Sequence, residues 1–180
     1  MRRLLLFPGH RILAYEWERG TCRRVEAFEP DDNGRAAFRG WLDEAPRTPV
    51  QLLVDVIEEE FHSDQLPHVI GRDRRDLYAR AAQKHFGNKE FRHIEYQGRC
   101  ADGRRDDRIL LAGLTNPDGL STWLGVIEQA AVPLKGIYSL PLLGQALLPH
   151  LGAARADRVL VVSQQVPRWG NSAWPNRGSE

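Results

Sequence analysis

Cysteine and long apolar runs are scarce in this sequence of 180 residues. Its two cysteines, Cys22 and Cys100, lie far apart and form no C-x-x-C pair, which excludes a disulfide scaffold and favours a reducing compartment. No apolar run approaches the roughly 18 to 20 residues that span a bilayer. The opening "MRRLLLF" imitates a signal peptide but breaks at Pro8-Gly9. We therefore expect a soluble, cytoplasmic protein that does not itself insert into a membrane.

Net charge is also close to zero. The formal charge is +1, and only three of the 25 basic residues are lysine. A chain so balanced is not recruited to nucleic acid or to an anionic membrane by its overall charge. The arginines of residues 72–80 and 99–108 alternate with aspartates, a pattern typical of ion-paired surfaces. Neither cluster has the interleaved aromatics and net positive face of a nucleic-acid site, so we predict no nucleic-acid partner.

Apolar periodicity predicts strands and helices in alternation. Strands are expected at residues 3–7, 11–18 and 23–28, at the front of "VQLLVDVIEEE", and in "EFRHIEYQGR", "RILLAGLT", "PLKGIYSL" and "DRVLVVSQQ". Helices are expected at residues 33–44 and in "GRDRRDLYARAAQKHF", "TNPDGLSTWLGVIEQAA" and "SLPLLGQALLPHL". The stretch "HSDQLPHVIG" is predicted to be a loop.

This order of elements predicts the fold class. A three-strand meander followed by alternating strands and helices favours an α/β protein with one mixed sheet flanked by helices. Such an order is that of the ribonuclease H-like, or actin-like, three-layer fold. Residues 1–163 are expected to form a single actin-like lobe. Residues 164–180 have no apolar period and are expected to be an aperiodic tail, where a second lobe is truncated.

Two stretches carry a resemblance to known families. "LLVDVIEEEFHSDQLPHVIGRDRRDLYARAAQKHF" reads as a strand, a Leu-Pro loop and a charged helix, and "RILLAGLTNPDGLSTWLGVIEQAAVPLKGIYSLPLLGQALL" reads as a strand, a helix, a small turn and a proline-containing helix. Both resemble units of type II secretion protein L, in its cytoplasmic domain, and of type IV pilus assembly protein M. The resemblance covers about residues 4–163. It implies an actin-like fold of two lobes that can hold ATP between them, and a docking role in a membrane-spanning machine.

The first hairpin, "FPGHR", departs from the nucleotide-binding members of these families. Close approach to phosphate needs glycine and backbone N–H donors. Pro8 has no N–H, Gly9 is the one small residue, and His10 and Arg11 are bulky. We therefore predict that the phosphate-binding loop is absent and that no cofactor is bound.

Other chemistry-bearing residues predict no catalytic and no metal site. The acidic run "DVIEEEFHSD" is interpreted as a solvated strand end, because consecutive carboxylates on a strand alternate faces and the strand at residues 3–7 supplies none. The histidines match no zinc spacing; these are His62, His68, His85 and His93. No serine lies in a G-x-S-x-G elbow.

The tryptophans divide into two groups. Trp17, Trp41 and Trp123 fall on core-facing periods and are predicted to be packing residues. Trp169 and Trp174 lie in the expected tail. As exposed aromatic residues they are either aggregation-prone groups at a fragment end or anchors of a contact.

Two hypotheses for function follow. The first is a non-catalytic protein-interaction domain of a bacterial secretion or pilus-type assembly, whose partners include inner-membrane machinery. The alternative is a nucleotide-binding actin-like ATPase lobe whose second half is missing. Under the alternative, ATP with magnesium binds at a remnant anion site formed by Gly9, His10, Arg11 and Asn116.

Overall fold

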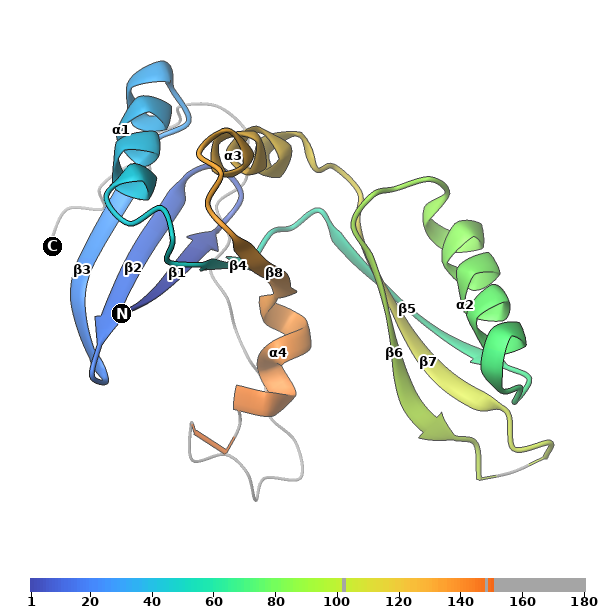
Figure 1. The fold of residues 1–180 in the computed structure, drawn as a ribbon. Helices are drawn as coiled ribbons and strands as arrows, with labels where there is room; N and C mark the ends of the chain where they lie inside the picture. The colour runs from blue at the N-terminus through green and yellow to red at the C-terminus, as the bar shows by residue number, and fades with distance from the viewer. Residues whose placement is uncertain (102, 148, 151–180) are drawn as a thin grey trace, which may run out of the picture. The chain divides into compact units, whose positions relative to one another are not determined.

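The structure is a computed structural model that describes residues 1–101, 103–147 and 149–150 (Figure 1). The chain divides into two compact units. Unit 1 contains Met1–Ile57 and the described residues from Gly119 onward, and unit 2 contains Glu58–Asp118. Unit 2 is therefore an insertion in the sequence of unit 1. The strand expected in "DRVLVVSQQ" and the expected tail at residues 164–180 lie outside the described residues.

Unit 1 is built on a five-stranded mixed sheet. Its strands are β1 (Arg2–Phe7), β2 (Ile12–Glu18), β3 (Thr21–Phe28), β4 (Val50–Val54) and β8 (Leu134–Ser139). Their order is β3-β2-β1-β4-β8, with β1, β2 and β3 antiparallel to their neighbours in the meander and β1, β4 and β8 parallel. This is the mixed sheet with an N-terminal meander that the sequence predicts, and the predicted fold class is confirmed.

Alternation along the strands selects the buried face of this sheet. Leu5 pairs with Ala14 on one side and with Leu52 on the other, and all three are buried. Their neighbours Leu4 and Leu13 point to the opposite face and are only partly buried. The main core of unit 1 therefore lies on one face of the sheet.

Helices α1 (Asp32–Asp43) and α3 (Asp118–Gln129) cover this buried face (Figure 1). The Asp31 side chain caps α1 by accepting the Gly34 N–H at 2.6 Å. Phe38 of α1 meets Trp123 of α3 edge to face, with ring centroids 5.5 Å apart, and both rings are buried. Helix α4 (Leu140–Leu147) follows β8, and Ser139 caps it, because Ser139 Oγ accepts the Leu142 N–H at 3.3 Å.

Unit 2 is a three-stranded antiparallel sheet with one helix. Its elements are β5 (Glu59–Leu66), α2 (Gly71–Phe86), β6 (Arg92–Arg99) and β7 (Asp107–Leu114). The strand order is β5-β7-β6. Its buried cluster joins Ala81, Ala82 and Phe86 of α2 to Ile109 and Leu111 of β7. Gly113 continues this face of β7, and a Cβ there would lie 2.5 Å from the Phe86 ring, so the close packing of helix and sheet requires glycine.

Two predictions about the sheets are wrong. The sequence predicts one sheet, whereas β5, β6 and β7 form a separate sheet. The central strand β7 pairs with β5 along one edge and with β6 along the other. The predicted loop "HSDQLPHVIG" contains the second half of β5. Local sequence fails there because β5 is polar and is held by cross-strand pairing with β7.

The prediction for the tryptophans holds for Trp41 and Trp123, which are buried, and fails for Trp17. Trp17 is partly exposed and stacks on Tyr15 with ring centroids 5.4 Å apart. The reason is its place on the strand, since odd-numbered residues of β2 point away from α1 and α3.

Candidate functional site

The parallel strands of unit 1 end side by side. Phe7 pairs with Val54, and Val54 pairs with Ser139, so the carboxyl ends of β1, β4 and β8 are neighbours. Ligands of open α/β sheets bind beyond the carboxyl ends of such strands. The hairpin with three of the four predicted anion-site residues leaves β1 at this edge.

The hairpin is compact but offers few anion ligands. Gly9 has a φ of 106°, a left-handed conformation that favours glycine. The Arg11 guanidinium pairs with the Glu29 carboxylate at 3.1 Å, so its positive charge already has a partner. His10 Nδ1 and Arg11 Nε are buried atoms without a hydrogen-bond partner among the described residues. The absence of a phosphate-binding loop therefore stays a prediction.

The fourth predicted residue, Asn116, belongs to unit 2. Its Oδ1 accepts the backbone N–H of Asp118 at 3.3 Å, which starts the first turn of α3. This is a local structural role at a helix start. The structure thus places Gly9, His10 and Arg11 in one hairpin, whereas Asn116 bonds the first turn of α3.

Asp55 is a buried carboxylate at this edge that the sequence reasoning misjudged. As part of the acidic run it was expected in a solvated strand end, yet its residue is only 7% exposed. The Asp55 N–H donates to the Phe7 carbonyl at 3.0 Å, and this bond fixes the chain beside β1 just after β4 ends. The available signal was its position directly after a run of buried-strand residues.

A second buried charge, Arg3 of β1, contacts the C-terminal end of helix α1 and is 1% exposed. The Arg3 guanidinium donates to backbone carbonyls at the C-terminal end of α1, at Trp41, Leu42 and Ala45, and lies 3.5 Å from the centroid of the Trp41 ring. Its Nε is 3.2 Å from the Glu16 carboxylate. Burial lowers the pKa of Arg3, and Glu16 opposes that shift. A cation at this position complements the negative end of the helix.

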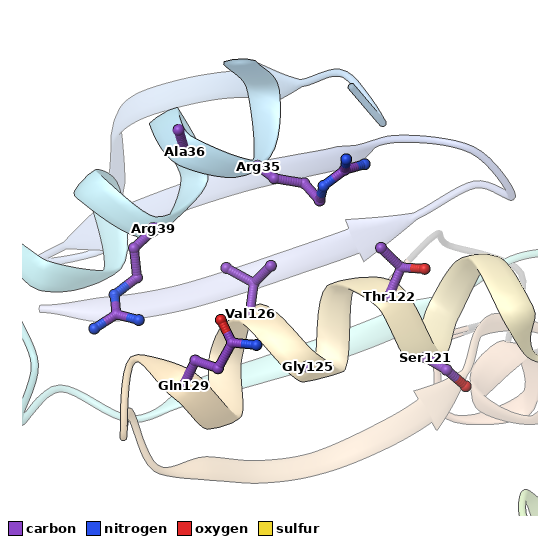
Figure 2. Close-up of a pocket in the computed structure, with 8 residues that line it drawn as sticks. All are labelled: Arg35, Ala36, Arg39, Ser121, Thr122, Gly125, Val126 and Gln129. Atoms are coloured by element: carbon purple, nitrogen blue, oxygen red, sulfur yellow. The ribbon is translucent and has the colours of Figure 1, made fainter. Parts of the chain in front are cut away.

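A groove of about 470 Å³ runs between α1 and α3 (Figure 2). Its lining residues are Arg35, Ala36, Arg39, Ser121, Thr122, Gly125, Val126 and Gln129. Figure 2 shows Thr122, Val126 and Gln129 rising from α3 toward α1. Arg35 pairs with Asp32, and Arg39 pairs with Asp43 at 3.1 Å. The sequence reasoning missed this groove, although two arginines four residues apart mark one face of a helix.

The histidines of unit 2 make pairwise contacts. His62 and His85 stack with ring centroids 4.6 Å apart, and His85 Nε2 lies 3.5 Å from an Asp64 oxygen. His68 Nδ1 bonds the buried Asp107 carboxylate at 2.9 Å. Among the described residues, no group of three or more histidine, cysteine, aspartate or glutamate side chains is placed to hold a metal ion. No helix in the described part of the chain is long and apolar enough to cross a membrane.

Comparison with known proteins finds no matching family model and no matching curated protein. Solved structures do align with the chain. A chain of the PilM-PilN type IV pilus biogenesis complex aligns with a TM-score of 0.58 at 11% identity, covering 87% of this chain and 52% of that chain. The cytoplasmic domain of EpsL, an inner membrane component of the type II secretion system of Vibrio cholerae, aligns with a TM-score of 0.47 at 12% identity, covering 76% and 56%.

The likeness to the chain of the pilus complex identifies the fold of this protein. The chain shares an actin-like α/β fold with that chain of the PilM-PilN complex, and it spans about half of that chain's length. The resemblance noted in the sequence to pilus assembly protein M is thereby confirmed at the level of the fold.

Proposed function

We propose that this protein is a non-catalytic protein-interaction domain of a bacterial pilus- or secretion-type assembly. The observation that carries the proposal is the likeness to a chain of the PilM-PilN type IV pilus biogenesis complex. This likeness covers 87% of the present chain. A fold shared with a component of such a complex supports a role in binding another protein. The site of action under this proposal is the cytoplasmic side of the inner membrane, where membrane-anchored machinery is the partner.

The same proposal includes independence from nucleotide. Support comes from the hairpin after β1, where Pro8 offers no N–H and the charge of Arg11 is paired with Glu29. A phosphate cradle relies on several convergent N–H donors and glycines, and this hairpin has one glycine. Binding of a protein partner then needs neither ATP nor magnesium.

One observation favours the alternative of a nucleotide-binding lobe. His10 Nδ1 and Arg11 Nε are buried without a described hydrogen-bond partner, at the edge where ligands of such sheets bind. Both atoms are N–H donors or, for the imidazole, a possible acceptor. An anion at this edge would satisfy them.

Affinity purification with chemical cross-linking tests the main proposal. The tagged full chain is expressed in its host and recovered with and without added Mg·ATP. We expect enrichment of envelope-assembly components to the same extent in both conditions. Trp123→Ala serves as the control bait, because loss of a buried core ring destabilises the folded surface without changing an exposed residue. No enrichment, or enrichment only with ATP, contradicts the proposal.

A further inference from the structure

We infer that unit 2 binds a divalent transition-metal ion, best matched by zinc, through His62, Asp64 and His85. His62 and Asp64 lie on β5, and His85 lies in the last turn of α2. All three residues belong to one compact unit. The inference goes beyond the proposed function and does not depend on it.

The strand places its ligands on one face. Glu60, His62 and Asp64 alternate along β5, so their side chains leave the same side of the strand. The end of α2 packs on that side, because the rings of His62 and His85 stack with centroids 4.6 Å apart. Two imidazoles and two carboxylates therefore gather where the end of α2 meets β5.

The distances between the donor atoms are close to those that a metal ion sets. His85 Nε2 lies 3.5 Å from Asp64 Oδ2, and His62 Nε2 lies 3.7 Å from Glu60 Oε2. Tetrahedral zinc bonds of about 2.0–2.1 Å separate two ligand atoms by ~3.3–3.4 Å. The Asp64 and His85 donors thus need to approach each other only slightly to share one ion.

Both of these donors are free to bind an ion. His85 Nε2 is a buried atom without a hydrogen-bond partner in the described part of the chain. Asp64 Oδ1 accepts the backbone N–H of Gln65 at 2.8 Å, which holds the carboxylate and leaves Oδ2 toward His85. A buried polar atom left unpaired costs free energy. A metal ion bound to His85 Nε2 and Asp64 Oδ2 removes that cost.

A rotation of the His62 ring completes the ligand set. As the side chains lie, no three such donors among the described residues surround one point, because the two imidazoles stack. The His62 side chain is 40% exposed, and the torsion that turns a histidine ring is broad. The ring can therefore turn a nitrogen toward Asp64 and His85. Water or Glu60 then takes the fourth position.

The types of donor select the metal. Calcium and magnesium take oxygen ligands, whereas imidazole suits zinc, copper and nickel. Two histidines and one carboxylate, with a fourth position left open, form an established zinc arrangement.

The ion would strengthen the weakest edge of unit 2. In the described sheet β5 is an edge strand with a polar sequence, paired with β7 along one side. The buried cluster joins α2 to β7, and β5 adds only the partly buried Leu66. Small units with limited cores are often stabilised by a bound metal. A zinc ion between His62, Asp64 and His85 ties β5 directly to α2.

Isothermal titration calorimetry with zinc chloride tests the site, on the full chain without a histidine tag. We expect one zinc ion per chain and a higher thermal unfolding temperature in its presence. His62→Gln, His85→Gln and Asp64→Asn should each weaken binding at least ~10-fold, because even changes to groups around metal ligands cost that much. His93→Gln is the matched control, since His93 is an exposed histidine of β6, and it should bind zinc as wild type does.

Cobalt(II) serves as a second probe, because its visible absorption reports the coordination geometry. We expect the absorption bands of a tetrahedral complex with wild type and their loss in His85→Gln. Circular dichroism checks that each variant is folded, which the partly exposed positions of the three ligands favour.

Three results overturn the inference. They are no binding of zinc by wild type, undiminished binding by both histidine variants, and an equal loss of affinity in His93→Gln. Magnesium binding as tight as that of zinc also contradicts it, because an ion that prefers oxygen does not need the imidazoles. Enrichment of envelope components tests the proposed function separately, so either proposal can fail without the other.

Discussion

Units 1 and 2 bury their cores by different means. Unit 1 places two helices with large aromatic residues on a five-stranded sheet, and Phe38, Trp41 and Trp123 fill the layer between them. Unit 2 places one helix on three strands and relies on close contact, with alanines on α2 and Gly113 beneath Phe86. Both the loss of volume from a packed core and the addition of volume to it destabilise a protein.

The two units also treat their buried charges differently. Arg3 of unit 1 is surrounded by backbone carbonyls and Glu16, whereas Asp107 of unit 2 bonds His68 and lies near Arg99. The carbonyls that Arg3 satisfies belong to the end of α1, so this charge holds a helix in place. Asp107 instead joins the start of β7 to the loop after β5 and to the end of β6. A buried charge in each unit thus links elements that lie far apart in sequence.

The largest effect is expected in the aromatic core of unit 1. Trp123→Ala removes a 1% exposed indole that contacts Phe38, and it should lower the free energy of unfolding by ~3–5 kcal/mol. Urea unfolding monitored by circular dichroism measures the loss. Trp17→Ala, at a partly exposed position, is the control and should cost much less. Equal losses would contradict the assignment of the core to the α1 and α3 face.

The buried cation comes next. Arg3→Met keeps the volume but leaves Glu16 and the carbonyls of α1 without their donor, and it should cost ~3 kcal/mol. Amide hydrogen exchange is expected to rise in α1 more than in α2. Arg2→Met, at the exposed neighbouring position, is the matched control. Unchanged protection of α1 in Arg3→Met would show that Arg3 does not hold the helix.

The stability of unit 2 should respond to a single methyl group added to its core. Gly113→Ala places a Cβ 2.5 Å from the Phe86 ring, and overpacking of this kind costs ~1–3 kcal/mol. Gly125→Ala in unit 1 meets open space and should instead stabilise α3 by up to ~1 kcal/mol. Opposite signs in thermal unfolding would show that Gly113 is required by close packing and Gly125 is not. A neutral Gly113→Ala would contradict the tight packing of α2 on β7.

The smallest effect is a pH dependence on the surface of unit 1. Hydrogen bonds from Arg24 lower the pKa of the Glu44 carboxyl. The stability that this pair contributes is therefore present above the ordinary glutamate pKa and is lost as pH falls through the lowered value. Glu44→Gln should reduce stability slightly at pH 7 and converge with wild type in acid. Chemical unfolding across this range measures the difference, and parallel curves would contradict the pairing.

Much of unit 1 could be predicted from the sequence because its signals are local. Alternation in β2, the helical period of residues 33–44 and the continuous apolar run of β4 each correspond to an observed element. The helical stripe of α2 was also predictable, with Gly87 at its end. What the sequence lacked was a signal for the second sheet. β5 is polar along one face, and only its pairing with β7 makes it a strand.

The candidate site was predicted less well, for a physical reason. The hairpin residues Gly9 to Arg11 were found because a turn is contiguous in sequence. The groove joins Arg39 to Gly125, which are far apart in the chain, and depends on how two helices pack on one sheet. Asp55 was misjudged because its burial depends on the neighbouring β1 strand.

Isothermal titration calorimetry of the full chain with Mg·ATP tests the central claim, which is that an actin-like fold here acts without nucleotide. We expect no specific heat of binding, because the hairpin after β1 has one glycine and Pro8 has no N–H, whereas a phosphate cradle relies on several glycines and N–H donors. The control titration uses Arg11→Ala, which removes the one cation of the hairpin and should give the same flat curve. A micromolar affinity for wild type, equivalent to about 8 kcal/mol of binding free energy, that is lost in Arg11→Ala would contradict the claim and establish a nucleotide site at this edge.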